Sequence, residues 1–183
     1  MIRNKPIVGI GTLPLLLGGF LTTVPPVFGG DAPDSAHVTT LLSEAKTQAF
    51  QVKEDAVTME SFDRMAVSRE MQAAMINQVR DHVNALVLTE QKLQAARPDA
   101  SAWQKQAINR IAPFLEEFNG YTSAVIEHLN REVPHTFAEY KDYLEANADY
   151  ATDLAQLIAD FVDYGRTKDR VEELKTKLEI PNR

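Results

Sequence analysis

The sequence predicts an all-α protein that folds as an up-down-up-down four-helix bundle. Four segments space their apolar residues alternately three and four positions apart, which is the period of a helix with one buried face. Prolines that stop helices and serines or threonines that cap them fall between these segments. No stretch alternates apolar and polar residues with a period of two for long enough to suggest a sheet. Because the connections are short, sequential helices are expected to be antiparallel neighbours.

The first 30 residues differ in composition from the rest and predict a secretory signal peptide. Arg3 and Lys5 precede an apolar run over 7–21, and Val27 and Gly29 suit the −3 and −1 positions of a cleavage site. The alternative is an uncleaved anchor, because the uncharged stretch is long enough to span a bilayer. Its many glycines and prolines favour cleavage. The protein is therefore expected to be periplasmic or secreted.

The remaining residues, 31–183, are expected to form a single domain. The chain carries a net charge of −7, and loss of two basic residues with the N-terminal segment would make it −9. An acidic surface repels phosphates, so nucleic acid is not an expected partner, and a membrane is expected only if the N-terminal segment stays attached. The absence of cysteine excludes disulfides, iron–sulfur clusters, Cys-ligated zinc and covalently attached haem.

The first two helices are predicted at 36–58 and 68–96. Ser35 is the expected N-cap of the first helix because its hydroxyl can accept a hydrogen bond from a free backbone N–H. The junction before the second helix falls within 60–67, with Ser61 and Ser68 as alternative caps.

The third helix is predicted at 102–131. Ser101 and Gln104 have the spacing of a capping box at its start. Pro113 and the turn-forming pair Asn119–Gly120 interrupt the segment, but the apolar rhythm runs through both. Pro113 falls on the side away from the core, where its missing hydrogen bond can be absorbed as a bend. A kinked continuous helix is the prediction, and a broken helix is the alternative.

The fourth helix is predicted at 137–165, with Thr136 and Glu139 as a second capping box. After Gly165 the chain becomes highly charged and either extends the fourth helix or forms a short tail helix over 167–179. This tail keeps a thin apolar stripe of Val171, Leu174 and Leu178.

Histidines raise the question of a metal or haem site inside the bundle. His82 and His128 occur in similar short sequences, but a turn near residue 99 would separate them by roughly 18 Å along the bundle axis. The Glu-x-x-His step of di-iron bundles does not occur in the sequence. We therefore expect no metal or cofactor. His82 is expected to be a partly buried imidazole bonded to a neighbouring helix, and His128 to be partly exposed.

Two polar residues fall on core stripes at the same expected height, Thr122 on the third helix and Asn147 on the fourth. A buried Asn usually fixes helix register at some cost in stability. We expect Thr122, Gln48 or Gln78 to satisfy Asn147. A small-ligand pocket is the alternative interpretation of these groups.

The fourth helix carries a second stripe beside its core stripe. Tyr143, Tyr150, Leu157 and Tyr164 recur every seven residues. They either widen the buried face, with hydroxyls at its rim, or leave a surface open to a protein partner or to a second copy of the chain. Trp103, at the start of the third helix, is expected to pack under the hairpin between the second and third helices.

Four stretches carry a resemblance to known proteins: Arg80–Asn84, Trp103–Ile108, Ile126–Asn130 and Ile158–Gly165. They resemble an uncharacterised family of small exported bacterial helical-bundle proteins. The resemblance implies a location in the bacterial envelope, and it brings no function, cofactor or site residue with it.

Signatures of common enzymes do not occur in the sequence. It has no phosphate-binding Gly-rich loop, no Gly-x-Ser-x-Gly elbow and no His-Glu-x-x-His motif. The sequence therefore predicts an exported protein-binding or structural module and not an enzyme. The alternative is a bundle that binds a small ligand, a metal or haem.

Overall fold

A computed structural model of the chain describes residues 32–62, 67–130 and 137–181. These ranges contain four α-helices and no strand, which confirms the predicted all-α four-helix fold. The helices are α1 (Ala36–Ser61), α2 (Arg69–Ala96), α3 (Ala102–Asn130) and α4 (Phe137–Lys177), with a short 3₁₀ turn, η2 (Arg97–Asp99), after α2. The predicted signal peptide lies outside the described residues. Among the helices described, none has both the length and the apolarity to cross a membrane.

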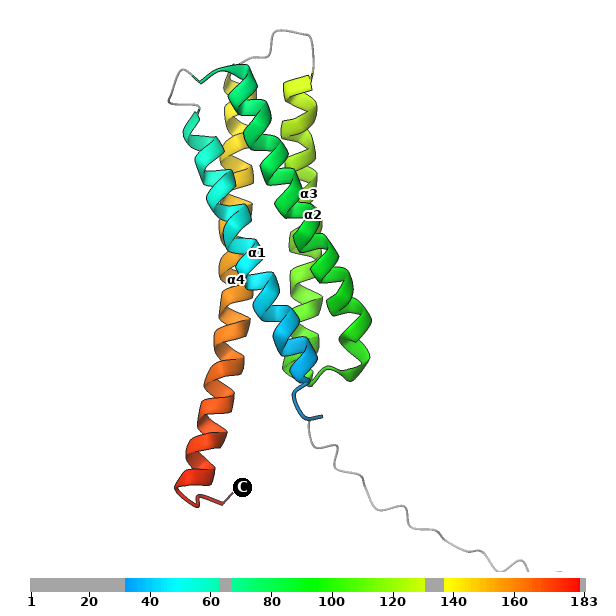
Figure 1. Cartoon of the computed structure of the whole chain (residues 1–183), viewed down its shortest axis with the longest axis vertical. Coiled ribbons are helices and arrows are strands. Elements are labelled where there is room, and N and C mark those ends of the chain that lie inside the picture. The colour runs from blue at the N-terminus through cyan, green and yellow to red at the C-terminus, as the bar shows by residue number, and fades with distance from the viewer. Residues whose placement is uncertain (1–31, 63–66, 131–136, 182–183) are drawn as a thin grey trace, which may run out of the picture. The chain divides into compact units, whose positions relative to one another are not determined.

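The four helices alternate in direction and pack as sequential neighbours (Figure 1). α1 packs mainly against α2 and α4, and α3 packs against the same two helices, so that α1 and α3 lie diagonally opposite. This is the up-down-up-down order expected from short connections. The core is filled by apolar side chains from all four helices. The largest fully buried ones are Leu42, Met59, Leu86, Leu93, Ile108, Ile111, Phe118, Leu144, Leu154 and Ile158.

Serine side chains begin the first two helices. The Ser35 hydroxyl accepts a hydrogen bond from the Val38 N–H at 3.4 Å, as predicted. Ser68 accepts one from the Met71 N–H at 3.2 Å and is the N-cap of α2. Of the two alternatives at this junction, Ser61 is instead the last residue of α1. The Thr136–Glu139 capping box lies outside the residues whose side chains are described.

α3 runs without a break through Pro113, which is exposed, and through Asn119–Gly120. The continuous helix is thus the correct alternative. Proline is tolerated because its ring lies on the solvent side, where a lost backbone hydrogen bond can be replaced by water. Gly120 has open space around it, since an added Cβ would meet no atom within 4 Å.

α4 also continues, through Gly165 to Lys177, so the charged tail extends the fourth helix and a separate helix over 167–179 does not form. Gly165 is needed for packing: an added Cβ would lie 2.7 Å from Cη2 of Trp103. The helix ends with the Ile180 N–H donating to the Lys175 carbonyl at 3.0 Å, and Glu179 adopts a φ of 55°. This is a Schellman ending, with a glutamate where glycine is usual.

Glu179→Gly should stabilise the end of α4. A side chain at positive φ costs about 1 kcal/mol, and glycine avoids that cost. We expect slower amide hydrogen exchange at Leu178 and Ile180, whose N–H groups close the last turn. Glu179→Ala is the matched control, because it removes the same charge and keeps the Cβ. If both variants slow exchange equally, charge and not backbone strain limits this turn.

Candidate functional site

His82 forms a polar contact between α2 and α1. Its Nδ1 lies 2.5 Å from Oδ2 of Asp55, and Gln78 Nε2 donates to the other Asp55 oxygen at 2.8 Å. The Asp55 side chain is 11% exposed and that of His82 35%. The expected partly buried imidazole, bonded to a neighbouring helix, is therefore confirmed. Asp55 was not predicted to be the partner of His82. An acidic residue between Val52 and Ala56, on the buried stripe of α1, nevertheless indicates a carboxylate that needs a polar partner.

His128 lies in the core, and the prediction that it is partly exposed is wrong. It is 3% exposed and stacks on Tyr140 with ring centroids 4.9 Å apart. Tyr143 packs edge-on against the same imidazole at 6.0 Å. The aromatic face of α4 is wider than one helical stripe, so it covers a residue at the border of the α3 stripe. Burial also raises the pKa of Tyr140 to about 12.

No cluster of three or more metal-ligating side chains occurs in the described part of the chain. His82 presents one ring nitrogen to Asp55, an arrangement that in metal sites orients a ligand but needs further ligands nearby.

Zinc, nickel and haem should therefore shift the melting temperature of the wild type no more than that of His82→Gln. A ligand that binds only the native state raises stability with its concentration. Thermal unfolding with each ligand in excess measures this. A stabilisation seen in the wild type and lost in His82→Gln would instead identify His82 as a ligand.

Thr122 and Asn147 meet in the core between α3 and α4, as their predicted heights required. The Thr122 hydroxyl donates to Asn147 Oδ1 at 3.0 Å, and the two residues are 2% and 1% exposed. Gln48 and Gln78 are not the partners of Asn147: Gln48 donates to Glu44, and Gln78 donates to Asp55. The pair lies among packed core side chains, which supports a structural role in helix register.

Gln104 joins the N-terminal ends of α1 and α3. Its Oε1 accepts the backbone N–H groups of Ser35 at 2.9 Å and of Ser101 at 3.0 Å. Its Nε2 donates to the Ser35 carbonyl and to the Thr39 hydroxyl, each at 3.0 Å. The bond to Ser101 is the Gln half of the predicted capping box. The bonds to α1 were not predicted, because local spacing does not show which helix end lies alongside.

Trp103 packs against α4 and the segment before α1, and not under the hairpin between α2 and α3 as predicted. Its ring covers Gly165 and meets Tyr164 edge-on at 5.5 Å. Its Nε1–H donates to Asp34 Oδ1 at 2.7 Å, and Lys168 Nζ donates to both Asp34 oxygens at 3.0 Å. We refer to Asp34, Trp103 and Lys168 as the basal tie. It holds together the start of α1, the start of α3 and α4.

The basal tie stabilises the charged form of Asp34. Burial alone would raise the pKa of this carboxyl, but the nearby Ser101 hydroxyl, Lys168 and Trp103 together hold it below its usual value. A carboxyl with a depressed folded pKa stabilises the fold at neutral pH and loses this effect as the pH falls through the folded pKa.

Asp34→Asn should therefore cost about 1 kcal/mol of unfolding free energy at pH 7. The difference from the wild type should begin to shrink below about pH 4, near the pKa of an unfolded aspartate. Urea unfolding of both proteins across this pH range measures it. A difference that stays constant with pH would show that the Asp34 charge contributes nothing.

The upper part of the tyrosine stripe on α4 packs against α3. Tyr143 and Tyr150 are half-buried, and the Tyr150 ring lies 4.7 Å from Tyr121 and 6.1 Å from Phe114. The Tyr121 hydroxyl and the charge of Glu117 raise the pKa of Tyr150, which places its hydroxyl at a polar rim. For these two residues the structure favours the widened buried face over an open surface. Leu157, the next residue in the stripe, is also half-buried.

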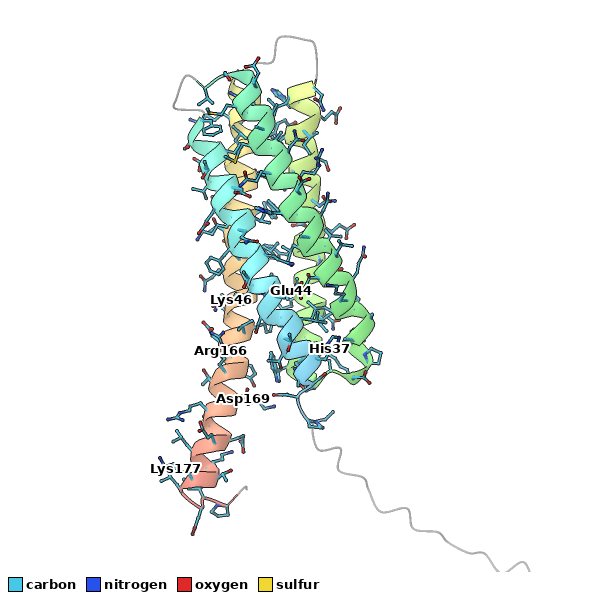
Figure 2. The ribbon with its side chains drawn as sticks, viewed as in Figure 1. His37, Glu44, Lys46, Arg166, Asp169 and Lys177 are labelled. Carbon is cyan, nitrogen blue, oxygen red and sulfur yellow. The ribbon has the colours of Figure 1, made fainter. Side chains whose placement is uncertain are left out.

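The lower part of the same stripe is open to solvent. Tyr164 is 54% exposed, and the stripe continues into the extension of α4 with Val171 at 43%, Leu174 at 38% and Leu178 at 62%. We call these four residues the outer stripe. Figure 2 shows Lys177 on the part of α4 that extends past the first turn of α1, marked by His37. The other exposed large apolar residues before it, Val57, Met71 and Leu88, lie apart on α1 and α2.

Two open grooves lie between α2 and α3. A groove of about 450 Å³ between α2 and α3 is lined by Val87, Pro113 and Asn119 with the carboxylates of Glu90 and Glu116. A smaller one of about 180 Å³ lies further along the same two helices, beside Arg80 and Leu129. Neither groove reaches the Thr122–Asn147 pair or His82.

The outer stripe is therefore the candidate functional site: an exposed apolar line on a long helix whose base is fixed by the basal tie. No protein-family model matches the chain, and neither a curated protein nor a solved structure shows significant similarity to it.

Proposed function

We propose that the protein is an exported binding module that engages a protein partner through the outer stripe of α4. The observation that carries the proposal is the alignment of exposed Tyr164, Val171, Leu174 and Leu178 on one side of a single helix. A monomeric protein gains nothing in stability from large apolar side chains held in water, and an aligned group of them is typical of an interaction surface. Export rests on the N-terminal segment with its basic start and apolar run.

The geometry of α4 supports this role. Its extension is continuous with the bundle, ends in a hydrogen-bonded cap and is joined to α1 and α3 through Lys168 and Gly165. A partner would therefore meet a preformed helix, so less conformational entropy is lost on binding than with an unfolded tail.

Site-specific photocross-linking tests the proposal. A benzophenone amino acid at Leu174 should cross-link the full chain to a protein partner in cells that make and export it. The same residue at Leu88, which is 58% exposed on α2, is the matched control. Cross-links to one defined protein from Leu174 alone would support the outer stripe as the binding surface. Equal products from both positions, or none from Leu174, would contradict it.

A further inference from the structure

From Lys168 to Lys177 the charges around the outer stripe are segregated by sign. With 3.6 residues per turn, basic side chains fall along both edges of the stripe and acidic side chains fall on the opposite side of the helix. The basic edges consist of Lys168 and Lys175 on one side and Arg170 and Lys177 on the other. The acidic side consists of Asp169, Glu172 and Glu173. Arg166 lies on this side nearer the bundle, where it pairs with Asp163 at 3.6 Å.

Ion pairs within α4 do not remove this segregation. Arg170 pairs with Glu173 at 2.6 Å and Lys175 with Glu172 at 2.7 Å, both three residues apart and exposed to solvent. Exposed pairs of this kind are weak, so the long basic side chains can turn from them to an acidic partner. Lys168 is held by Asp34, which leaves three basic groups beside the stripe for such a partner.

The spacing of the outer stripe fits a partner helix. Tyr164, Val171 and Leu178 are seven residues apart, and Leu174 lies three residues after Val171, which is the pattern of a coiled-coil seam. In such a pair the edge residues of one helix meet the edge residues of the other, in both parallel and antiparallel arrangements.

A second copy of this chain is a poor occupant for that reason. The edges from Lys168 to Lys177 would place basic groups against basic groups. Asp163 continues one edge toward the bundle, but its carboxylate is bonded to Lys46 at 3.0 Å. An anionic lipid surface is disfavoured by the net charge of −7 and by the few apolar residues in the stripe.

We propose that the outer stripe receives an amphipathic helix of another protein, whose own apolar stripe is bordered by aspartate and glutamate. This inference rests on the proposed function and specifies the chemistry of the partner. The apolar contact supplies most of the affinity, and the charges at both edges select the partner and its register.

Two synthetic three-heptad peptides test the charge complementarity. Both carry leucine at the seam positions; one carries glutamate and the other lysine at the edge positions. We expect the full-length protein to bind the glutamate peptide at least about tenfold more tightly in fluorescence anisotropy at low salt, and added salt should narrow the difference. Equal affinity, or tighter binding of the lysine peptide, would overturn the inference and leave the outer stripe as a binding surface of other chemistry.

Variants show whether binding occurs at the outer stripe. Arg170→Glu with Lys177→Glu should abolish the preference for the glutamate peptide, while Thr176→Glu, on the opposite side of α4, should keep it. Val171→Ser with Leu174→Ser should abolish binding, whereas Val57→Ser with Leu88→Ser, at exposed positions on α1 and α2, should not. A glutamate preference that survives both outer-stripe variants would overturn the inference.

The remaining outcomes separate this inference from the proposed function. If neither peptide binds but Leu174 still gives cross-links, the acidic partner helix is overturned and the proposed function is retained. If neither peptide binds and Leu174 gives no cross-links, the further inference and the proposed function are both overturned. Binding to phosphatidylglycerol vesicles without binding of the glutamate peptide would overturn it in favour of a lipid surface. A dimer in sedimentation that is lost in Val171→Ser with Leu174→Ser would overturn it in favour of a second copy.

Discussion

Replacing Gln104 with alanine should lower the free energy of unfolding by about 3–4 kcal/mol. Gln104 is fully buried and makes four hydrogen bonds, two through its carbonyl oxygen and two through its amide nitrogen. The alanine variant leaves the Ser101 N–H without its acceptor in a buried position, and an unpaired buried donor costs about 1–3 kcal/mol by itself. The cavity left by the side chain adds to this cost. Denaturant unfolding followed by circular dichroism measures the loss.

Two further substitutions show which part of Gln104 matters. Gln106→Ala, two residues along the same helix and exposed, should change stability by no more than about 0.5 kcal/mol. Gln104→Glu keeps an acceptor for both N–H groups and loses the donor to Ser35 and Thr39, so it should cost about 1–2 kcal/mol. An alanine variant as stable as the Gln106 control would show that the bonds between α1 and α3 do not form in solution.

Gly165→Leu should cost about 3 kcal/mol, although leucine is a far better helix former than glycine. The new side chain has no room because even its Cβ would lie 2.7 Å from Trp103. Trp103 cannot easily move aside, since its Nε1–H is bonded to Asp34 and its ring packs on Tyr164. Replacing a mid-helix glycine improves helix propensity by at most about 1 kcal/mol. The cost of overpacking is larger, so the net change in stability should be a loss.

Gly120→Leu is the matched control in α3 and should raise stability, whereas Gly165→Leu lowers it. Nothing lies within 4 Å of its added Cβ, so helix propensity alone should raise stability by about 0.5–1 kcal/mol. Chemical denaturation of both variants gives the comparison. Stabilisation by both substitutions would mean that Trp103 does not cover α4.

The four main helices, their order and most of their starts could be predicted from the sequence because each depends on local periodicity and capping. The end of α4 could not, because Gly165 has the identity of a helix terminator and the helix runs on to Lys177. The contact of Thr122 with Asn147 could be predicted for a related reason. Once a hairpin is fixed by its turn, counting residues from that turn gives the height of each side chain in the bundle. The burial of His82 followed from the same helical geometry.

Contacts at the base of the bundle could not be predicted in this way. Trp103, Asp34 and Lys168 come from three separate elements, and Asp34 and Lys168 are 134 residues apart. Their meeting depends on how far each helix runs past its neighbours, which hydrophobic periodicity does not determine. Gly165 illustrates the difficulty. It has the identity of a helix terminator, and its need for a bare backbone appears only when the Trp103 ring is placed against it.

The predicted exposure of His128 is wrong because a helical wheel assigns burial from one helix alone. Its exposure is set by Tyr140 and Tyr143 of α4, whose rings extend the core sideways. The lower end of α4 differs in the opposite sense. There α4 extends beyond the other helices. The heptad stripe, which α3 covers near Tyr150, is therefore exposed to solvent and forms the outer stripe.

The position of α1 between α2 and α4 has a consequence for the order of events during synthesis. Of the four described helices, α1 leaves the ribosome first, yet α4, one of its two main neighbours, leaves last. About 100 residues separate the start of α1 from the start of α4, which at 5–20 residues per second is a delay of roughly 5–20 s. During that time the alanine-rich stripe of α1 has no α4 to cover it, and Asp34 has no Lys168. The base of the bundle therefore forms only after α4 emerges, and until then the buried face of α1 is accessible to chaperones.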